Sequence, residues 1–198
     1  MNMNLKYLSS IIACEPLSHD FFQVSLHAPD LPQATPGQGI CLDANNIFVP
    51  ILDSTPPILK LIFPKSLTAQ IHNNQLAHGG LQGNILPAPI TGEFQLLLAE
   101  DLALSACLFY LKKYARVFKG LVLLGATGYF PFKPAPSRLL VPGMPPGVIA
   151  ALPLLEDWGI ASRLASLADI PGVFKGTVAE LSKTLPSTLG GSAQRLNF

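Results

Sequence analysis

Residues 93–125 read EFQLLLAEDLALSACLFYLKKYARVFKGLVLLG and predict the architecture of the second half of the chain. Residues 93–99 are almost continuously apolar, which is typical of a strand covered on both faces of its sheet. Residues 102–116 then carry apolar side chains at helical spacing. Residues 120–125 form a second apolar run. A strand, a helix and a strand in this order predict two parallel strands joined by a right-handed crossover.

Further elements of an α/β domain follow this unit. The many prolines of residues 131–153 favour an extended segment, with one candidate strand at residues 137–141. We expect a short helix at residues 152–158 and a third strand at residues 160–167. Thr177 and Glu180 have the spacing of a capping box that opens another helix. The tail after Pro186 contains glycine and serine, and we expect it to fray.

The residues before this region predict β structure. Residues 21–27 alternate apolar and polar side chains, and short apolar runs follow at residues 40–42, 47–52 and 58–63 with turn residues between them. One or two helical turns are expected within residues 66–73. We therefore predict a small antiparallel β-barrel domain at residues 1–92. A three-layer α/β domain with a parallel sheet is expected at residues 93–198.

Composition excludes several classes of protein. Of the 198 residues, 49% are hydrophobic and 13% are charged, so the chain can bury enough surface to fold. The net charge of +1 argues against a nucleic-acid-binding protein. No apolar run has membrane-spanning length, and three widely spaced cysteines argue against zinc and iron–sulfur sites. These features predict a cytoplasmic protein with free thiols, and its scarce charge makes a homodimer the default expectation.

Four segments carry a resemblance to a known family. Residues 18–22, the Pro-Gly-Gln turn at residues 36–38 and the run at residues 80–84 resemble stretches of the ferredoxin reductase-like flavoproteins. Residues 171–178 resemble a segment found in the electron-transfer subunits of dihydroorotate dehydrogenases within that superfamily. The resemblance implies FAD in the barrel, a nicotinamide nucleotide in the α/β domain and electron transfer to a redox partner protein.

The stretch that matches the family's flavin-binding motif has lost two of its functional side chains. The motif is Arg-x-Tyr-Ser or Arg-Pro-x-Ser, and residues 48–53 match it with Pro50 in place. Val49 stands at the arginine position and Leu52 at the serine position, with Ile51 between Pro50 and Leu52. Losing the arginine removes a charge-assisted contact worth about 1.5–3 kcal/mol. FAD binding is therefore an expectation that comes from the resemblance and not from this stretch.

The family's second phosphate-binding turn falls on residues 65–68. Ser66 and Thr68 could cap a helix and bind phosphate oxygens, and Lys65 could supply positive charge. The resemblance thus predicts a set of flavin contacts in the first half of the chain: Pro50, Ile51, Leu52, Lys65, Ser66, Thr68 and Gly80.

The loop after the first parallel strand argues against NAD(P). Family members have a glycine-rich run here, whereas residues 99–106 contain no glycine and place Glu100 and Asp101 where a diphosphate would lie. Like charges about 4 Å apart repel by roughly 4 kcal/mol at an effective dielectric constant of about 20. The simpler interpretation is that one of these carboxylates caps the following helix. Gly125 and Thr127 follow the second strand and either contact a ligand or form a plain turn.

Two functional hypotheses follow. The first is a flavoprotein-like electron-transfer subunit or oxidoreductase accessory protein with degenerate cofactor motifs and no predicted catalytic residue. The second is a non-catalytic binding or assembly module that keeps the fold. The family's Cys-Gly-Pro segment and the four-cysteine cluster motif are both missing. We therefore expect a C-terminally short α/β domain without an iron–sulfur cluster.

Overall fold

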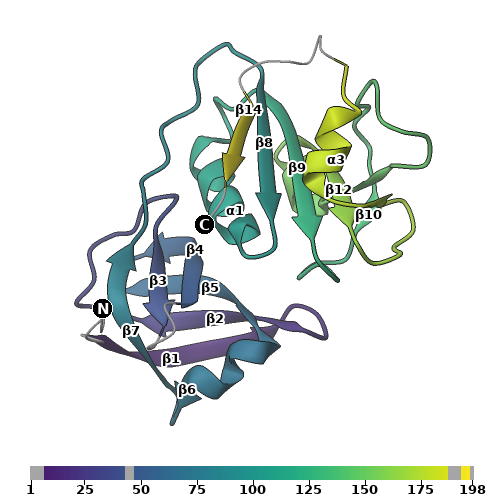
Figure 1. The fold of residues 1–198 in the computed structure, drawn as a ribbon. Helices are drawn as coiled ribbons and strands as arrows, with labels where there is room; N and C mark the ends of the chain where they lie inside the picture. Colours follow the sequence, from purple (N-terminus) through teal and green to yellow (C-terminus); the bar gives the residue numbers. More distant parts are fainter. Residues whose placement is uncertain (1–6, 43–46, 187–192, 197–198) are drawn as a thin grey trace. The chain divides into compact units, whose positions relative to one another are not determined.

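A computed structural model describes residues 7–42, 47–186 and 193–196 (Figure 1). The chain divides into two compact units. The first contains the described residues up to Pro87, and the second contains most of those from Ala88 onward.

The first unit is an antiparallel β-barrel, as the sequence predicts. Its six strands lie in the order β1-β2-β5-β4-β3-β7, and β7 pairs back to β1, which closes the barrel (Figure 1). A two-residue strand, β6, pairs with β7 in antiparallel orientation, and a 3-10 helix labelled η1 follows β5. The bounds are β1 Tyr7–Pro16, β2 Phe21–His27, β3 Gly39–Leu42, β4 Ile47–Thr55, β5 Ile58–Pro64, η1 Lys65–Gln70, β6 Ile71–His72 and β7 Gln75–Gln82.

Alternate side chains of these strands form the barrel core. Each fully buried aliphatic or aromatic side chain contributes roughly 1.5–3 kcal/mol by leaving water. The core residues with no exposed surface are Val24, Leu26, Ile40, Leu42, Val49, Ile51, Leu61, Phe63 and Leu76. The short apolar runs of the sequence therefore pack against one another in one continuous core inside the barrel.

The second unit contains a five-stranded sheet in the order β13-β12-β9-β8-β14, and every pairing in it is parallel. The segment between β9 and β12 carries a separate two-stranded pairing, β10 with β11. The bounds are β8 Gln95–Glu100, α1 Ala103–Tyr114, β9 Gly120–Ala126, β10 Ala135–Pro136, β11 Ala150–Ala151, α2 Pro153–Asp157, β12 Ala161–Ser166, β13 Phe174–Lys175, α3 Val178–Lys183 and β14 Ala193–Leu196.

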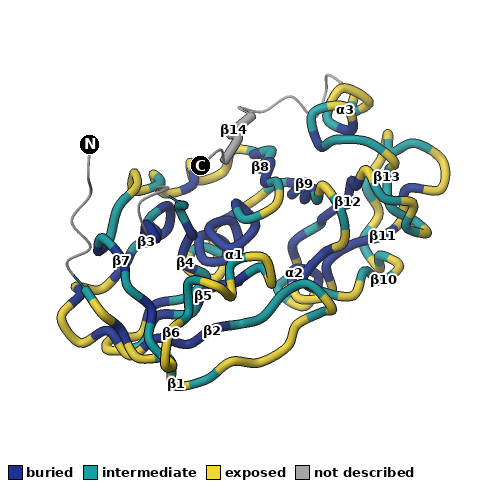
Figure 2. Tube along the Cα trace, turned by 60° about the horizontal axis from the view of Figure 1, so that its bottom comes forward, coloured by how far each residue is buried: buried dark blue, intermediate teal, exposed yellow. Residues whose placement is uncertain are grey.

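The strand order determines on which face of the sheet each helix lies. The chain moves from β8 to β9 through α1, and from β12 and β13 to β14 through α3, in opposite directions across the sheet. Right-handed crossovers in opposite directions put their helices on opposite faces, which produces three layers. Leu98, Leu121 and Leu123 pack with α3 on one face. The alternate residues of the same strands are equally buried, so both faces of the sheet are covered (Figure 2).

Two expectations about the second half are wrong in detail. Residues 137–141 form no strand, and the short pairing lies instead at β10 and β11. The tail does not fray throughout, because residues 193–196 form β14 and pair with Leu96–Ala99 of β8. Nothing in the short sequence Ala193–Leu196 signals a strand. The free edge of β8 supplies the hydrogen-bonding partners that order it.

Candidate ligand edge of the parallel sheet

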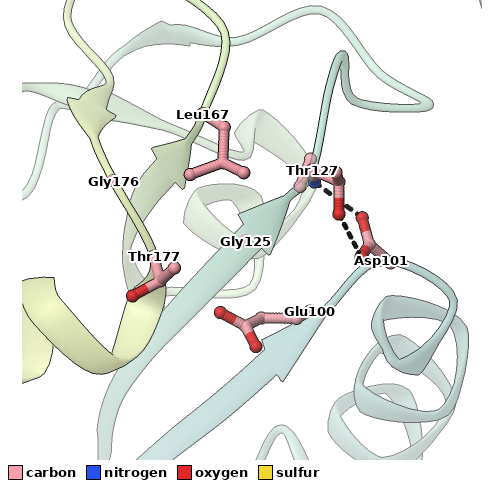
Figure 3. A pocket seen from close by; sticks show the side chains of 8 residues that line it. Glu100, Asp101, Gly125, Thr127, Leu167, Gly176 and Thr177 are labelled. Carbon is pink, nitrogen blue, oxygen red and sulfur yellow. Dashed lines mark hydrogen bonds between the residues drawn. The ribbon is translucent and has the colours of Figure 1, made fainter.

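A cavity of about 110 Å³ opens at the carboxyl ends of β8, β9 and β12 (Figure 3). This is the edge at which open α/β sheets bind ligands, next to the point where the strand order reverses. The residues that line it are Glu100, Asp101, Gly125, Ala126, Thr127, Leu167, Gly176 and Thr177. The predicted residues Gly125 and Thr127 are therefore brought together here with the two carboxylates.

Asp101 joins the ends of β8 and β9. Its carboxylate accepts two hydrogen bonds from Thr127, one from the backbone N–H at 2.7 Å and one from Oγ1 at 2.7 Å. The backbone N–H of Asp101 donates to the carbonyl oxygen of Gly125 at 2.9 Å. The φ of Asp101 is +48°, a left-handed conformation that aspartate tolerates better than most residues. This backbone turn accompanies an aspartate side chain that reaches across to β9.

Glu100 joins β8 to the start of α3. Its Oε1 accepts a hydrogen bond from the backbone N–H of Val178 at 3.1 Å. Gly125 lies beside this contact, and a Cβ on Gly125 would come within 2.8 Å of Glu100 Cγ and 2.9 Å of Val178 Cγ1. Only glycine fits there without displacing the glutamate, so the Glu100 side chain occupies the space that a side chain at position 125 would need.

The expectation that Glu100 or Asp101 caps the following helix is wrong. The N-cap of α1 is Leu102, which makes no side-chain capping bond, and no acidic residue lies in the first turn. Both carboxylates point away from α1 and form the contacts with Thr127 and Val178 described above (Figure 3). Their hydrogen-bond donors come from strands and helices distant in sequence, which the local pattern does not reveal.

Thr177 at the rim of the cavity forms the predicted capping box. The Glu180 carboxylate accepts from the N–H of Thr177 at 2.8 Å, and the Glu180 N–H donates to Thr177 Oγ1 at 3.2 Å. These hydrogen bonds hold the pKa of Glu180 below its ordinary value. The N–H and the hydroxyl of Thr177 therefore both donate to the Glu180 carboxylate of α3 and not toward the cavity.

Among residues 7–42, 47–186 and 193–196, no group of three or more histidine, cysteine, aspartate or glutamate side chains is arranged to hold a metal ion. Within the same ranges, no helix is both long and apolar enough to cross a membrane. The edge is an acidic cavity at which the N–H and hydroxyl groups of Thr127 and Thr177 and the N–H of Val178 donate to carboxylates of this chain.

The side chains at the predicted flavin contacts of β4 are mostly inside the barrel. Val49 and Ile51 have no exposed surface and belong to the barrel core, Pro50 is buried, and Leu52 is half-buried. No cation or hydroxyl stands at positions 49 or 52, so β4 supplies neither the charge nor the donor of the family motif. The site residues on this strand remain predictions, and their fit to FAD is poor.

Three further predicted flavin contacts lie on η1. Lys65, Ser66 and Thr68 are exposed, and Thr68 Oγ1 donates to the carbonyl oxygen of Lys65 at 2.8 Å. The N-cap residue is Pro64, and it receives no side-chain capping bond. The charge of Lys65 and the hydroxyl of Ser66 are therefore the groups here that best fit an anionic cofactor.

Gly80, the last predicted flavin contact, lies in the barrel wall against a buried histidine. Its φ is +85°, and a Cβ would lie 2.7 Å from the ring of Tyr7. Its N–H donates to His78 Nδ1 at 3.1 Å, while Ser9 Oγ lies 2.9 Å from His78 Nε2. The Nδ1 atom is thus an acceptor, which assigns the proton of the neutral ring to Nε2. Burial lowers the pKa of His78.

A buried charged cluster fixes the proline-rich segment to β12. Arg163 is 4% exposed and donates to Ser137 Oγ at 2.9 Å and to the Leu139 carbonyl at 2.8 Å. The Glu156 carboxylate accepts from the Ser137 hydroxyl and from the Arg138 N–H. Burial acts to raise the pKa of Glu156, but these hydrogen bonds together hold it below its ordinary value. Burial also disfavours the charged form of Arg163, and it therefore lowers the pKa of that guanidinium.

The sequence indicates part of this cluster. It suggests Glu156 and Asp157 as ion-pair partners of the arginines, and Arg138 pairs with both. It does not indicate that Arg163 and Glu156 are buried, since charged residues usually lie on the surface. Their burial accompanies the hydrogen bonds that residues 137–139 form with Arg163 of β12 and with Glu156.

Comparison with solved structures identifies the fold. The NADH-dependent reduced ferredoxin–NADP oxidoreductase has 13% identity and a TM-score of 0.55, with 90% of this chain and 63% of that chain covered. A ferredoxin–NADP⁺ reductase from Neisseria gonorrhoeae, solved with FAD and NADP, has 11% identity and a TM-score of 0.57, covering 89% and 75%. This chain therefore spans less than two thirds of the first protein's length.

A third structure agrees with these two. The flavohaem-like FAD/NAD-binding domain of nitric oxide dioxygenase from Vibrio cholerae O1 biovar El Tor has 10% identity and a TM-score of 0.57, covering 85% of this chain and 78% of that one. No protein-family profile matches the sequence, and no curated protein matches it. At these identities the likeness shows a ferredoxin reductase-like fold.

Proposed function

We propose that this chain, which has a ferredoxin reductase-like fold, is an accessory electron-transfer protein that does not itself take electrons from a nicotinamide nucleotide. The supporting observation is the pair of contacts from Asp101 to Thr127 and from Glu100 to Val178. A dinucleotide diphosphate would meet two carboxylates at this edge, and the N–H groups beside it already have acceptors. Its reductant would then be a redox partner protein.

The proposal includes FAD as the group that would supply one- and two-electron chemistry in the barrel. Lys65 and Ser66 are the exposed residues best suited to its phosphate groups, while the hydroxyl of the third predicted contact, Thr68, donates to the Lys65 carbonyl oxygen. The residues of β4 do not fit the family's way of holding FAD, because Val49 and Leu52 stand at the positions of the motif's arginine and serine. The nearer likeness to the electron-transfer subunit of dihydroorotate dehydrogenase also remains a prediction.

Anaerobic reduction of FAD-reconstituted protein tests this function. The visible spectrum is recorded after FAD is added in excess and the protein is desalted. We expect a flavin spectrum that dithionite bleaches and that NADH and NADPH leave unchanged over the same period. Rapid bleaching by either nucleotide would show that the α/β unit delivers hydride, and it would refute the proposal.

A second function is favoured by the burial of Val49 and Ile51 in the barrel core. In this case the chain is a non-catalytic binding or assembly module that binds a redox protein or a second copy of itself. A flat visible spectrum after reconstitution, together with unchanged thermal stability in FAD, selects this function over the first. Light scattering at micromolar concentration then determines whether a homodimer forms, and a monomeric mass excludes the second copy as the partner.

A further inference from the structure

We propose that Glu100 and Asp101 act as built-in ligands, which close the ligand edge of the parallel sheet and exclude anions from it. This inference rests on the proposed lack of nicotinamide nucleotide binding and gives it a cause. The carboxylates do more than repel a phosphate, because they occupy the donors that an anion at this edge would use. An empty crevice would instead leave those donors facing solvent.

The contacts of Asp101 carry most of the argument. Its two oxygens take one donor each from Thr127, the N–H and the hydroxyl, both at 2.7 Å. A phosphate group bound at a strand end uses the same kinds of donor, backbone N–H and hydroxyl groups. The carboxylate of Asp101 therefore satisfies Thr127 as a bound oxyanion would.

Glu100 supplies the second closing contact. Through Val178 it connects β8 to α3, and Figure 3 shows its side chain directed into the cavity opposite Leu167. The absence of a side chain at Gly125 leaves room for the Glu100 methylene groups. Carboxylates from consecutive residues thus reach both β9 and α3. The result is an edge that is held together without a ligand.

The inference predicts that removing the carboxylates creates an anion site. Asp101→Gly suits the left-handed φ of +48°, and Glu100→Ala removes the side chain that reaches Val178. The matched control is Glu93→Gln/Asp157→Asn, which removes the same number of negative charges from two exposed residues that do not line the cavity. This control separates a loss of contacts at the edge from a change in net charge.

Binding of pyrophosphate is measured by isothermal titration calorimetry at constant ionic strength, because salt screens such interactions. We expect no saturable binding to the wild type or to the Glu93→Gln/Asp157→Asn control. The Glu100→Ala/Asp101→Gly protein should bind at least tenfold more tightly than either, and its melting temperature should rise with pyrophosphate concentration. Equal binding by all three proteins, or no binding by a double variant with a native circular dichroism spectrum, would overturn the inference.

Amide exchange provides a second readout that needs no stable double variant. In the wild type, the N–H groups of Thr127 and Val178 should be protected. The single variant Asp101→Gly should increase exchange at Thr127 far more than at Val178. Rapid exchange at Thr127 in the wild type refutes the inference. Neither readout involves the barrel, so a failure here is distinct from a failure to bind flavin in the proposed function.

Discussion

Replacing Glu156 with alanine should destabilise the second unit by about 3–5 kcal/mol. Glu156 is 9% exposed. Removing its carboxylate leaves Arg163, itself 4% exposed, without the nearby negative charge and leaves the Arg138 N–H without its acceptor. Breaking a buried charge cluster by removing one partner costs about this much, because the remaining charge is neither paired nor hydrated. The effect should therefore exceed that of any exposed ion pair in the same cluster.

Asp157 offers the matched control. It pairs with the same Arg138 at 2.8 Å, but the Asp157 and Arg138 side chains are 63% and 67% exposed. An exposed pair of this kind is worth about 0.2–1 kcal/mol, so Asp157→Ala should change stability little. The two variants remove neighbouring carboxylates that share a partner and differ mainly in burial.

Urea unfolding followed by tryptophan fluorescence measures both effects. Trp158, the only tryptophan of the chain, is the C-cap residue of α2 and reports on this unit. With a urea m-value of about 1–3 kcal/mol/M, Glu156→Ala should lower the midpoint by at least about 1 M. A midpoint that shifts no further than that of Asp157→Ala would refute the reasoning that burial makes this cluster important.

Three further predictions concern the barrel and the thiols. Because burial lowers the pKa of His78, the imidazole takes up its proton at a higher pH in the unfolded chain than in the folded one. Barrel stability should therefore be intact above pH 6.5 and fall as the pH drops below it. Urea midpoints measured by circular dichroism should show this decrease, and His78→Phe should abolish most of it. Gly80→Ala should cost about 2–4 kcal/mol from its left-handed φ and its clash with Tyr7, and an unchanged melting temperature would contradict this. Burial raises the pKa of Cys107 to about 12, so a thiol reagent should label exposed Cys14 in the native protein and reach Cys107 only after denaturation, as peptide mapping would show.

The chain's own pattern predicts most of the fold. The sequence predicts a strand, a helix and a strand at residues 93–99, 102–116 and 120–125, and β8, α1 and β9 lie there within a few residues. Thr177 and Glu180 form the predicted capping box. These elements could be predicted because periodicity, apolar runs and caps are local properties of the sequence. Strand β14 could not, because residues 193–196 are ordered by the free edge of β8.

In the candidate site, too, some features follow from the sequence and others only from the tertiary structure. The sequence by itself determined that acidic residues replace glycines after the first parallel strand, that Gly125 and Thr127 follow the second, and that β4 lacks the family's arginine and serine. Only the tertiary structure decided what those acids do, since their donors on Thr127 and Val178 lie 26 and 78 residues away along the chain. Residue types follow from the sequence directly. Hydrogen-bond partners depend on which strand ends the parallel pairing brings side by side.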